Sequence, residues 1–78
     1  MDKQQGEKNK MKKTALLEAA LMHFKSEKSK AAANLEIYLT NPSAIGDHPD
    51  LVAEVINLIK AIAAADECIK VITEKRRK

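Results

Sequence analysis

The chain has 78 residues, with 14 Lys or Arg against 11 Asp or Glu, which gives a formal net charge of +3. Two Gly, two Pro, one Tyr, one Phe and no Trp argue against a turn-rich β fold and for an aliphatic, helical protein. A single Cys excludes an internal disulfide, no zinc-finger spacing occurs, and a chain this short forms one domain with a small core.

The two ends of the chain are basic. Residues 1–13 hold five Lys and residues 75–78 hold four basic residues, whereas residues 14–74 hold five Lys against nine acids. The body of the protein is therefore mildly acidic. Residues 1–10 have few side chains that a core would bury, and we expect them to form a disordered basic tail. The folded part is predicted to span residues 11–78.

A first helix is predicted over residues 12–40. Its core positions follow heptad spacing. They are Leu17, Leu21, Phe24, Lys28, Ala31, Leu35 and Tyr38. A break near Ser26–Ser29, with a serine capping a new helix, is the alternative. A continuous helix is favoured because the heptad phase survives this polar segment, which has no Gly or Pro. Lys28 would then lie along the core face and reach solvent or Asp66 with its ammonium group.

Residues 41–48 are predicted to form the loop. Pro42 ends the first helix, since proline disfavours helical geometry in the residue before it and has no N–H to donate. Gly46 permits a tight turn. Asp47 is predicted to cap the second helix, with Pro49 in the first turn and Asp50 near the positive end of the helix dipole.

A second helix is predicted over residues 49–74, followed by a basic end at 75–78. Between Leu51 and Ile72, 16 of 22 residues are apolar. One row follows the heptad template: Leu51, Val55, Leu58, Ile62, Ala65, Ile69 and Ile72. A second row lies beside it: Val52, Ile56, Ile59 and Ala63. This second row stops at Asp66 and Lys70.

Two helices of similar length joined by a short loop predict an all-α, antiparallel helical hairpin. One neighbouring helix can cover the first row, so the second row needs another surface. We therefore expect coiled-coil-like packing of two hairpins into a homodimeric four-helix bundle. The predicted interface residues are Leu51, Val52, Val55, Ile56, Ile59, Ile62 and Ala63. The alternative is that the second row packs under the first helix and the loop, with Ile45 covering part of it.

The basic ends suggest a second kind of partner. In a hairpin the start of the first helix and the end of the second lie together, and such a cluster can bind phosphates without reading sequence. The candidate phosphate contacts are Lys12, Lys13, Lys75, Arg76, Arg77 and Lys78. A solvated tail and a basic run that complements the helix dipole explain the same charges, and no aromatic residue among them can stack on bases.

Candidate catalytic or metal-binding residues are sparse. His48, between Asp47 and Asp50, could serve as a metal ligand or general base, but this pattern is too common to specify a site and a capping or turn role is favoured. His23 and Glu27, one turn apart, are expected to be solvated, and Cys68 to be a small core residue. We expect no enzyme activity, no cofactor and no metal. No apolar run is long enough for a membrane span, so a soluble cytoplasmic protein is expected.

The segment from Tyr38 to Asp50 (YLTNPSAIGDHPD) resembles part of small proteins encoded by large tailed phages, including those of cyanobacteria. Those proteins carry a similar Asn-Pro, Ile-Gly, acid-His and Asp series between two helices, and the resemblance covers about residues 30–72. It implies a phage accessory protein acting on a host or phage protein, and no particular chemistry. The segment departs from that pattern at two positions, having Ala44 in place of glycine and Asp47 where glutamate is commoner.

The resemblance implies that a role shared with those proteins would fall on Ile45, Gly46, Asp47 and His48. Each of these turn residues also has a local geometric reason to be present. From the sequence we therefore expect a non-enzymatic helical protein–protein interaction module, with a small nucleic-acid-binding protein as the alternative.

Overall fold

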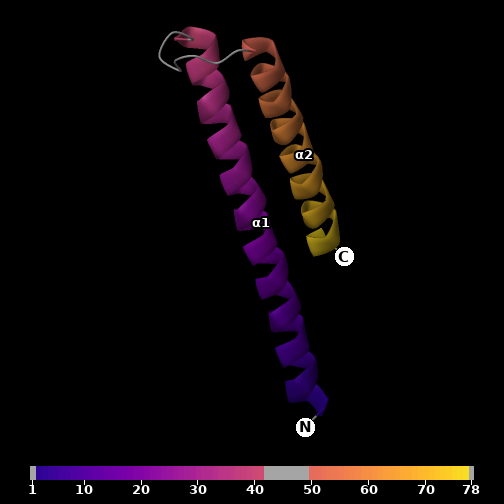
Figure 1. The fold of residues 1–78 in the computed structure, drawn as a ribbon. Coiled ribbons are helices and arrows are strands. Elements are labelled where there is room, and N and C mark those ends of the chain that lie inside the picture. The colour runs from indigo at the N-terminus through magenta and orange to yellow at the C-terminus, as the bar shows by residue number, and fades with distance from the viewer. Residues whose placement is uncertain (1, 42–49, 78) are drawn as a thin grey trace.

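The computed structural model describes residues 2–41 and 50–77, with side chains described from residue 13 onward. It contains two α-helices, α1 (Asp2–Thr40) and α2 (Leu51–Arg77). They pack against each other in opposite directions, as Figure 1 shows. The predicted all-α helical hairpin is therefore confirmed.

The start of α1 differs from the prediction. The helix begins at Asp2, ten residues before the predicted start at residue 12, and so includes most of the segment expected to be a disordered tail. Lys, Gln and Glu have high helix propensity, and lengthening an existing helix needs no new nucleation step. At 39 residues against 27, α1 is 12 residues longer than α2, or ~18 Å at the helical rise. Its N-terminal end projects past the end of α2 (Figure 1).

The course and the end of α1 agree with the prediction. The helix runs unbroken through the polar segment from Lys25 to Lys30, so the alternative break near Ser26–Ser29 is wrong. It ends at Thr40, as predicted. The last turn closes with the Asn41 N–H donating to the Ile37 carbonyl at 2.8 Å.

The start of α2 corrects two details. The helix begins at Leu51, two residues after the predicted start at residue 49. The capping side chain is Asp50, whose Oδ1 accepts a hydrogen bond from the Ala53 N–H at 3.0 Å. Aspartate is a preferred N-cap because it satisfies a backbone donor that has no partner in the first turn. Asp47, the predicted cap, and the rest of the predicted loop from Pro42 to His48 lie outside the described residues.

The end of α2 lies at Arg77, three residues after the predicted end at Glu74. The helix thus includes most of the basic C-terminal segment. Lys75, Arg76 and Arg77 form its last turn, where positive side chains are favourable beside the negative end of the helix dipole.

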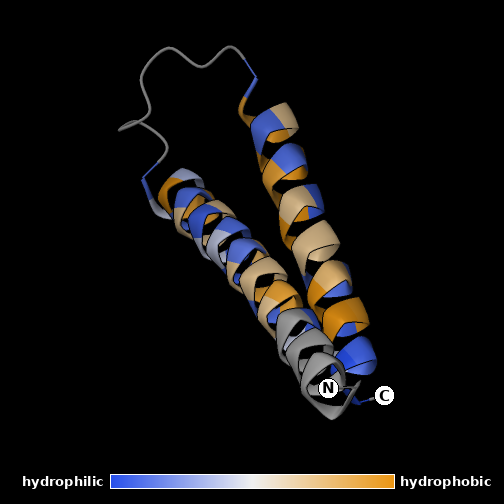
Figure 2. Ribbon diagram, turned by 90° about the horizontal axis from the view of Figure 1, so that it is seen from below, coloured by the Kyte–Doolittle hydropathy of each residue, from blue (hydrophilic) through white to orange (hydrophobic). Residues whose placement is uncertain are grey.

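The two heptad rows meet in a single line of contact, here called the seam. On α1 it contains Leu17, Leu21, Phe24, Lys28, Ala31, Leu35 and Tyr38; on α2 it contains Leu51, Val55, Leu58, Ile62, Ala65, Ile69 and Ile72. Among the residues whose side chains are described, the buried hydrophobic ones are Leu21, Ala31, Ala65 and Ile72, and all four are seam residues. The heptad assignment was therefore right. In Figure 2 the ribbons lie farther apart near the loop than at the open end of the hairpin.

Two ion pairs across the seam define the register of the helices. Lys28 Nζ lies 2.6 Å from Asp66 Oδ1, and Arg76 Nη1 lies 3.4 Å from Glu18 Oε2. Moving one residue toward the loop along α1 therefore corresponds to moving one residue toward the start of α2, and this register tells which residues of the two helices lie level. Lys28 reaches Asp66 from a seam position, as the sequence predicted.

Candidate protein–protein interface

The second apolar row of α2, here called the aliphatic strip, consists of Val52, Ile56, Ile59 and Ala63. These residues recur every three or four positions and so share one side of the helix. All four are exposed, and the exposed fractions of Val52, Ile56 and Ile59 are 69%, 46% and 51%. The strip ends at Asp66, the next position on this side of the helix.

Helix α1 does not cover the strip. The seam row of α2 faces α1, and the strip lies about a quarter turn or more to one side of it on the helical wheel. The alternative in which the strip packs under the first helix is therefore wrong. Ile45, the other residue proposed to cover it, lies outside the described residues.

Leu39 of α1 extends this apolar surface. It lies 11 residues after Lys28, just over three full helical turns, and so shares a side of α1 with Lys28. Because Lys28 reaches Asp66, which continues the strip row, that side of α1 adjoins the strip. The register places Leu39 level with Val55, and Leu39 is 62% exposed.

The sequence prediction missed Leu39 because the residue is off the heptad row. The sequence feature that could have identified Leu39 is its position: it is a large apolar residue in the last turn before the loop, and the strip begins soon after the loop.

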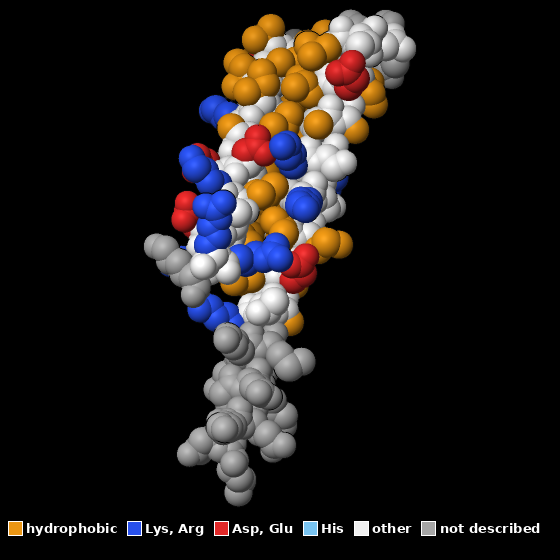
Figure 3. Space-filling view, turned by 180° about the vertical axis from the view of Figure 1, so that it is seen from behind, with side chains coloured by type: hydrophobic (Ala, Val, Ile, Leu, Met, Phe, Trp, Pro, Cys, Tyr) orange, Lys and Arg blue, Asp and Glu red, His pale blue; other side chains and the backbone are white. Residues whose placement is uncertain are grey.

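The part of the hairpin between Ala31 and the loop has no buried residue among those described. The register places Leu21 near Ile72 and Ala31 near Ala65, so all four buried residues lie in the middle or toward the open end. Near the loop, the seam residues Leu35, Tyr38, Val55 and Leu58 are only half-buried. Figure 3 shows hydrophobic side chains gathered over this part of both helices, with an acidic side chain beside them near the loop and most of the charged side chains farther toward the open end.

The structure divides the predicted interface residues into two groups. Val52, Ile56, Ile59 and Ala63 are exposed and lie on one row. Val55 and Ile62 are half-buried in the seam with α1, and Leu51, the first residue of α2, is at the edge of exposure at 37%. Of the predicted interface residues, α1 therefore leaves the strip exposed, and Leu39 adds to the strip from α1.

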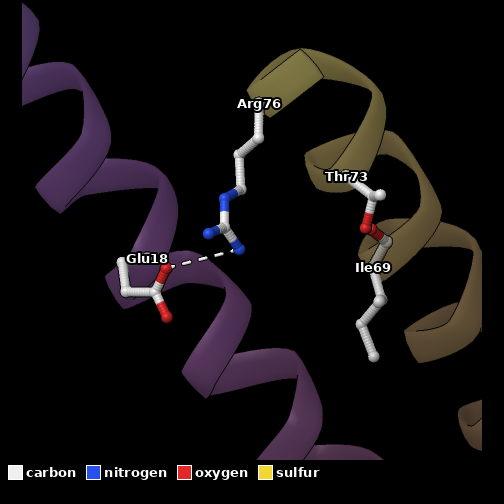
Figure 4. A network of polar contacts seen from close by, with 4 residues as sticks. All are labelled: Glu18, Ile69, Thr73 and Arg76. Atoms are coloured by element: carbon white, nitrogen blue, oxygen red, sulfur yellow. Dashed lines mark hydrogen bonds and ion pairs between the residues drawn. The ribbon is translucent and has the colours of Figure 1, made fainter.

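Among the candidate phosphate contacts whose side chains are described, Arg76 forms an ion pair. Lys13, Lys75 and Arg77 are exposed. Arg76 reaches across to Glu18, as Figure 4 shows. The side chains of Lys12 and Lys78 lie outside the described residues.

The remaining candidate residues form no site in the described part of the chain. The His23 ring meets the Phe24 ring edge to face, with centroids 4.9 Å apart and planes at 80°, and both His23 and Glu27 are exposed. Cys68 is a half-buried free thiol. Within residues 13–41 and 50–77, no three His, Cys, Asp or Glu side chains group as metal ligands would. His48 lies outside the described residues.

Neither described helix has an apolar stretch of the length needed to cross a membrane. Comparison of the chain with protein-family models, with curated proteins and with solved structures gives no match. The resemblance of the loop to phage proteins therefore stays a prediction.

Proposed function

We propose that this protein is a non-enzymatic helical interaction module that self-associates through the aliphatic strip and Leu39, as a homodimeric four-helix bundle. The observation that carries this proposal is the exposure of Val52, Ile56 and Ile59 on one row of α2 while α1 occupies the neighbouring row. Clustered exposed aliphatic side chains are typical of interaction surfaces.

The surface area of the chain supports a second copy as the partner. The protein exposes 6466 Å², whereas a compact monomer of 8.6 kDa would expose about 4,700 Å². The radius of gyration is 18.3 Å, against about 11.5 Å for a compact domain of this length. The projecting end of α1 accounts for part of this excess. A standard interface buries about 800 Å² per partner, which the remaining surface can supply.

The biological setting is a further part of the proposal. The resemblance of the loop favours a phage accessory protein that acts on a host or phage protein in the bacterial cytoplasm. In that setting Ile45, Gly46, Asp47 and His48 would contribute to the shared role.

The direct test is the mass in solution at micromolar concentration, measured by sedimentation. We expect the wild type to be a dimer and Ile56→Asp to dimerise at least tenfold more weakly, because the carboxylate would lose its hydration at the interface. The matched control is Asn57→Asp, which adds the same charge at the next residue, an exposed position outside the strip.

Ile59→Asn provides a milder variant without a new charge, should Ile56→Asp fail to fold. Far-UV circular dichroism of each variant checks that the helices remain. A wild type that sediments as a monomer, or an Asn57→Asp variant that dissociates as readily as Ile56→Asp, would overturn the proposal.

The second candidate function is phosphate-backbone binding by the basic end. It is supported by the position of Lys13 at the same end of the hairpin as Lys75 and Arg77. A mobility-shift titration at several salt concentrations tests it. Binding that falls steeply with salt and disappears when residues 75–78 are deleted would support it, and no binding at low salt would exclude it.

A further inference from the structure

We infer that the two copies pack antiparallel, strip on strip, with their loops at opposite ends of the bundle. This inference rests on the proposed self-association and specifies its geometry. The strip occupies Val52 to Ala63, within the half of α2 nearest the loop, while the basic residues of the last turn of α2 lie at the other end of the hairpin. A dimer that buries the strip must therefore bring together the loop-side halves of the two α2 helices. The dimer geometry then determines how far apart the two basic ends lie.

Two twofold arrangements stack the strip-bearing faces of the hairpins. An axis parallel to the helices keeps both loops at one end and lays α2 of one copy over α1 of the other. An axis at right angles to the helices puts the loops at opposite ends and lays α2 over α2. The strip belongs to α2, so only the second arrangement covers strip with strip. The first arrangement would lay the strip over the side of α1 on which Leu39 is level with Val55.

Charge favours the same arrangement. With the loops at one end, the last turns of both α2 helices would lie within one or two helix spacings, of about 10 Å each. That distance is only one to three times the screening length of about 8 Å at physiological salt, so Lys75 and Arg77 of the two copies would repel each other weakly there and more strongly at low salt. With the loops at opposite ends, the last turns lie roughly 50 Å apart, where screening removes the repulsion.

The length of the strip fits an antiparallel pair. With the axis between Ile56 and Ile59, Ile56 lies opposite Ile59 of the second copy, and Val52 lies opposite Ala63 of the second copy. Every strip residue then meets an apolar residue. Asp66 lies beyond the strip of the second copy, where its carboxylate can keep its ion pair with Lys28.

The test is a distance measured between the two copies by pulsed electron spin resonance. A spin label on Lys75→Cys, in a Cys68→Ala background, should give a distance centred near ~50 Å, set by the helical rise. The arrangement with loops together would give roughly 15–20 Å. Sedimentation of the same labelled sample reports whether it is dimeric.

The outcomes separate the two proposals. A dimer with a distance below ~30 Å, shorter than the helical rise allows for opposed loops, would overturn this inference and leave self-association standing. A monomer with no label-to-label distance would overturn both. As a second readout, Val52→Cys mixed with Ala63→Cys should form a disulfide between copies, whereas either variant alone should not, because a disulfide needs Cα atoms within about 7 Å.

Discussion

Lys28 and Asp66 join the two helices through an ion pair of 2.6 Å between Nζ and Oδ1. Lys28 occupies a seam position where the other six residues of α1 are apolar, and its side chain leaves the seam to reach the carboxylate on the strip side of α2. The two side chains are 46% and 51% exposed, and half-exposed pairs of this kind contribute at most about 1 kcal/mol.

Replacing Lys28 therefore tests whether its ion pair or apolar packing in the seam contributes more to the free energy of unfolding. We expect Lys28→Leu to raise the free energy of unfolding by ~0.5–1 kcal/mol, since added apolar contact outweighs the loss of a half-exposed pair. Urea unfolding at fixed protein concentration measures the change. Lys30→Leu, on an exposed side of α1, is the control and should change little; a loss of stability in Lys28→Leu would show that the pair dominates.

Asp50 should stabilise α2 as its N-cap. Asp50→Ala removes the acceptor for the Ala53 N–H and should lower the free energy of unfolding by ~1 kcal/mol. Asp50→Asn keeps a side-chain acceptor and should retain most of the stability. Thermal unfolding of both variants distinguishes capping from a general charge effect, which would make the two losses equal.

Ala65 should mark the closest approach of the helices. It is 3% exposed, and the register places it near the buried Ala31, so a larger side chain there must push the helices apart. Ala65→Leu should lower the free energy of unfolding by ~1–3 kcal/mol through overpacking. Ala64→Leu, at the neighbouring exposed position, should be nearly neutral, and equal effects in chemical denaturation would contradict this packing.

Leu21 should contribute most to the core toward the open end. It is 5% exposed, and Leu21→Ala should cost about 2 kcal/mol or more from lost burial and the cavity left behind. The control is Met22→Ala, which shortens an exposed side chain at the next residue. Similar melting temperatures for the two variants would show that the seam does not bury Leu21 as described.

Much of the hairpin could be predicted from local patterns. The heptad spacing from Leu17 to Tyr38 and from Leu51 to Ile72 identified the seam, and Asn41-Pro42 identified the end of α1. The start of α1 could not be predicted, because residues 2–11 have helix propensity but no apolar row to require a helix. The cap of α2 was assigned to Asp47 instead of Asp50 because a Pro-containing acidic segment offers several chemically equivalent starts.

The sequence by itself determined that this protein is two long helices with one apolar row each and an additional aliphatic row on the second, because helical periodicity depends only on residue spacing. The tertiary structure alone decided the register that pairs Lys28 with Asp66 and Glu18 with Arg76, and with it which apolar residues stay exposed. The physical reason is that a single neighbouring helix can cover only about one side of another helix. Which apolar residues are covered therefore depends on how α1 lies along α2. That placement leaves Val52, Ile56, Ile59 and Leu39 in contact with water.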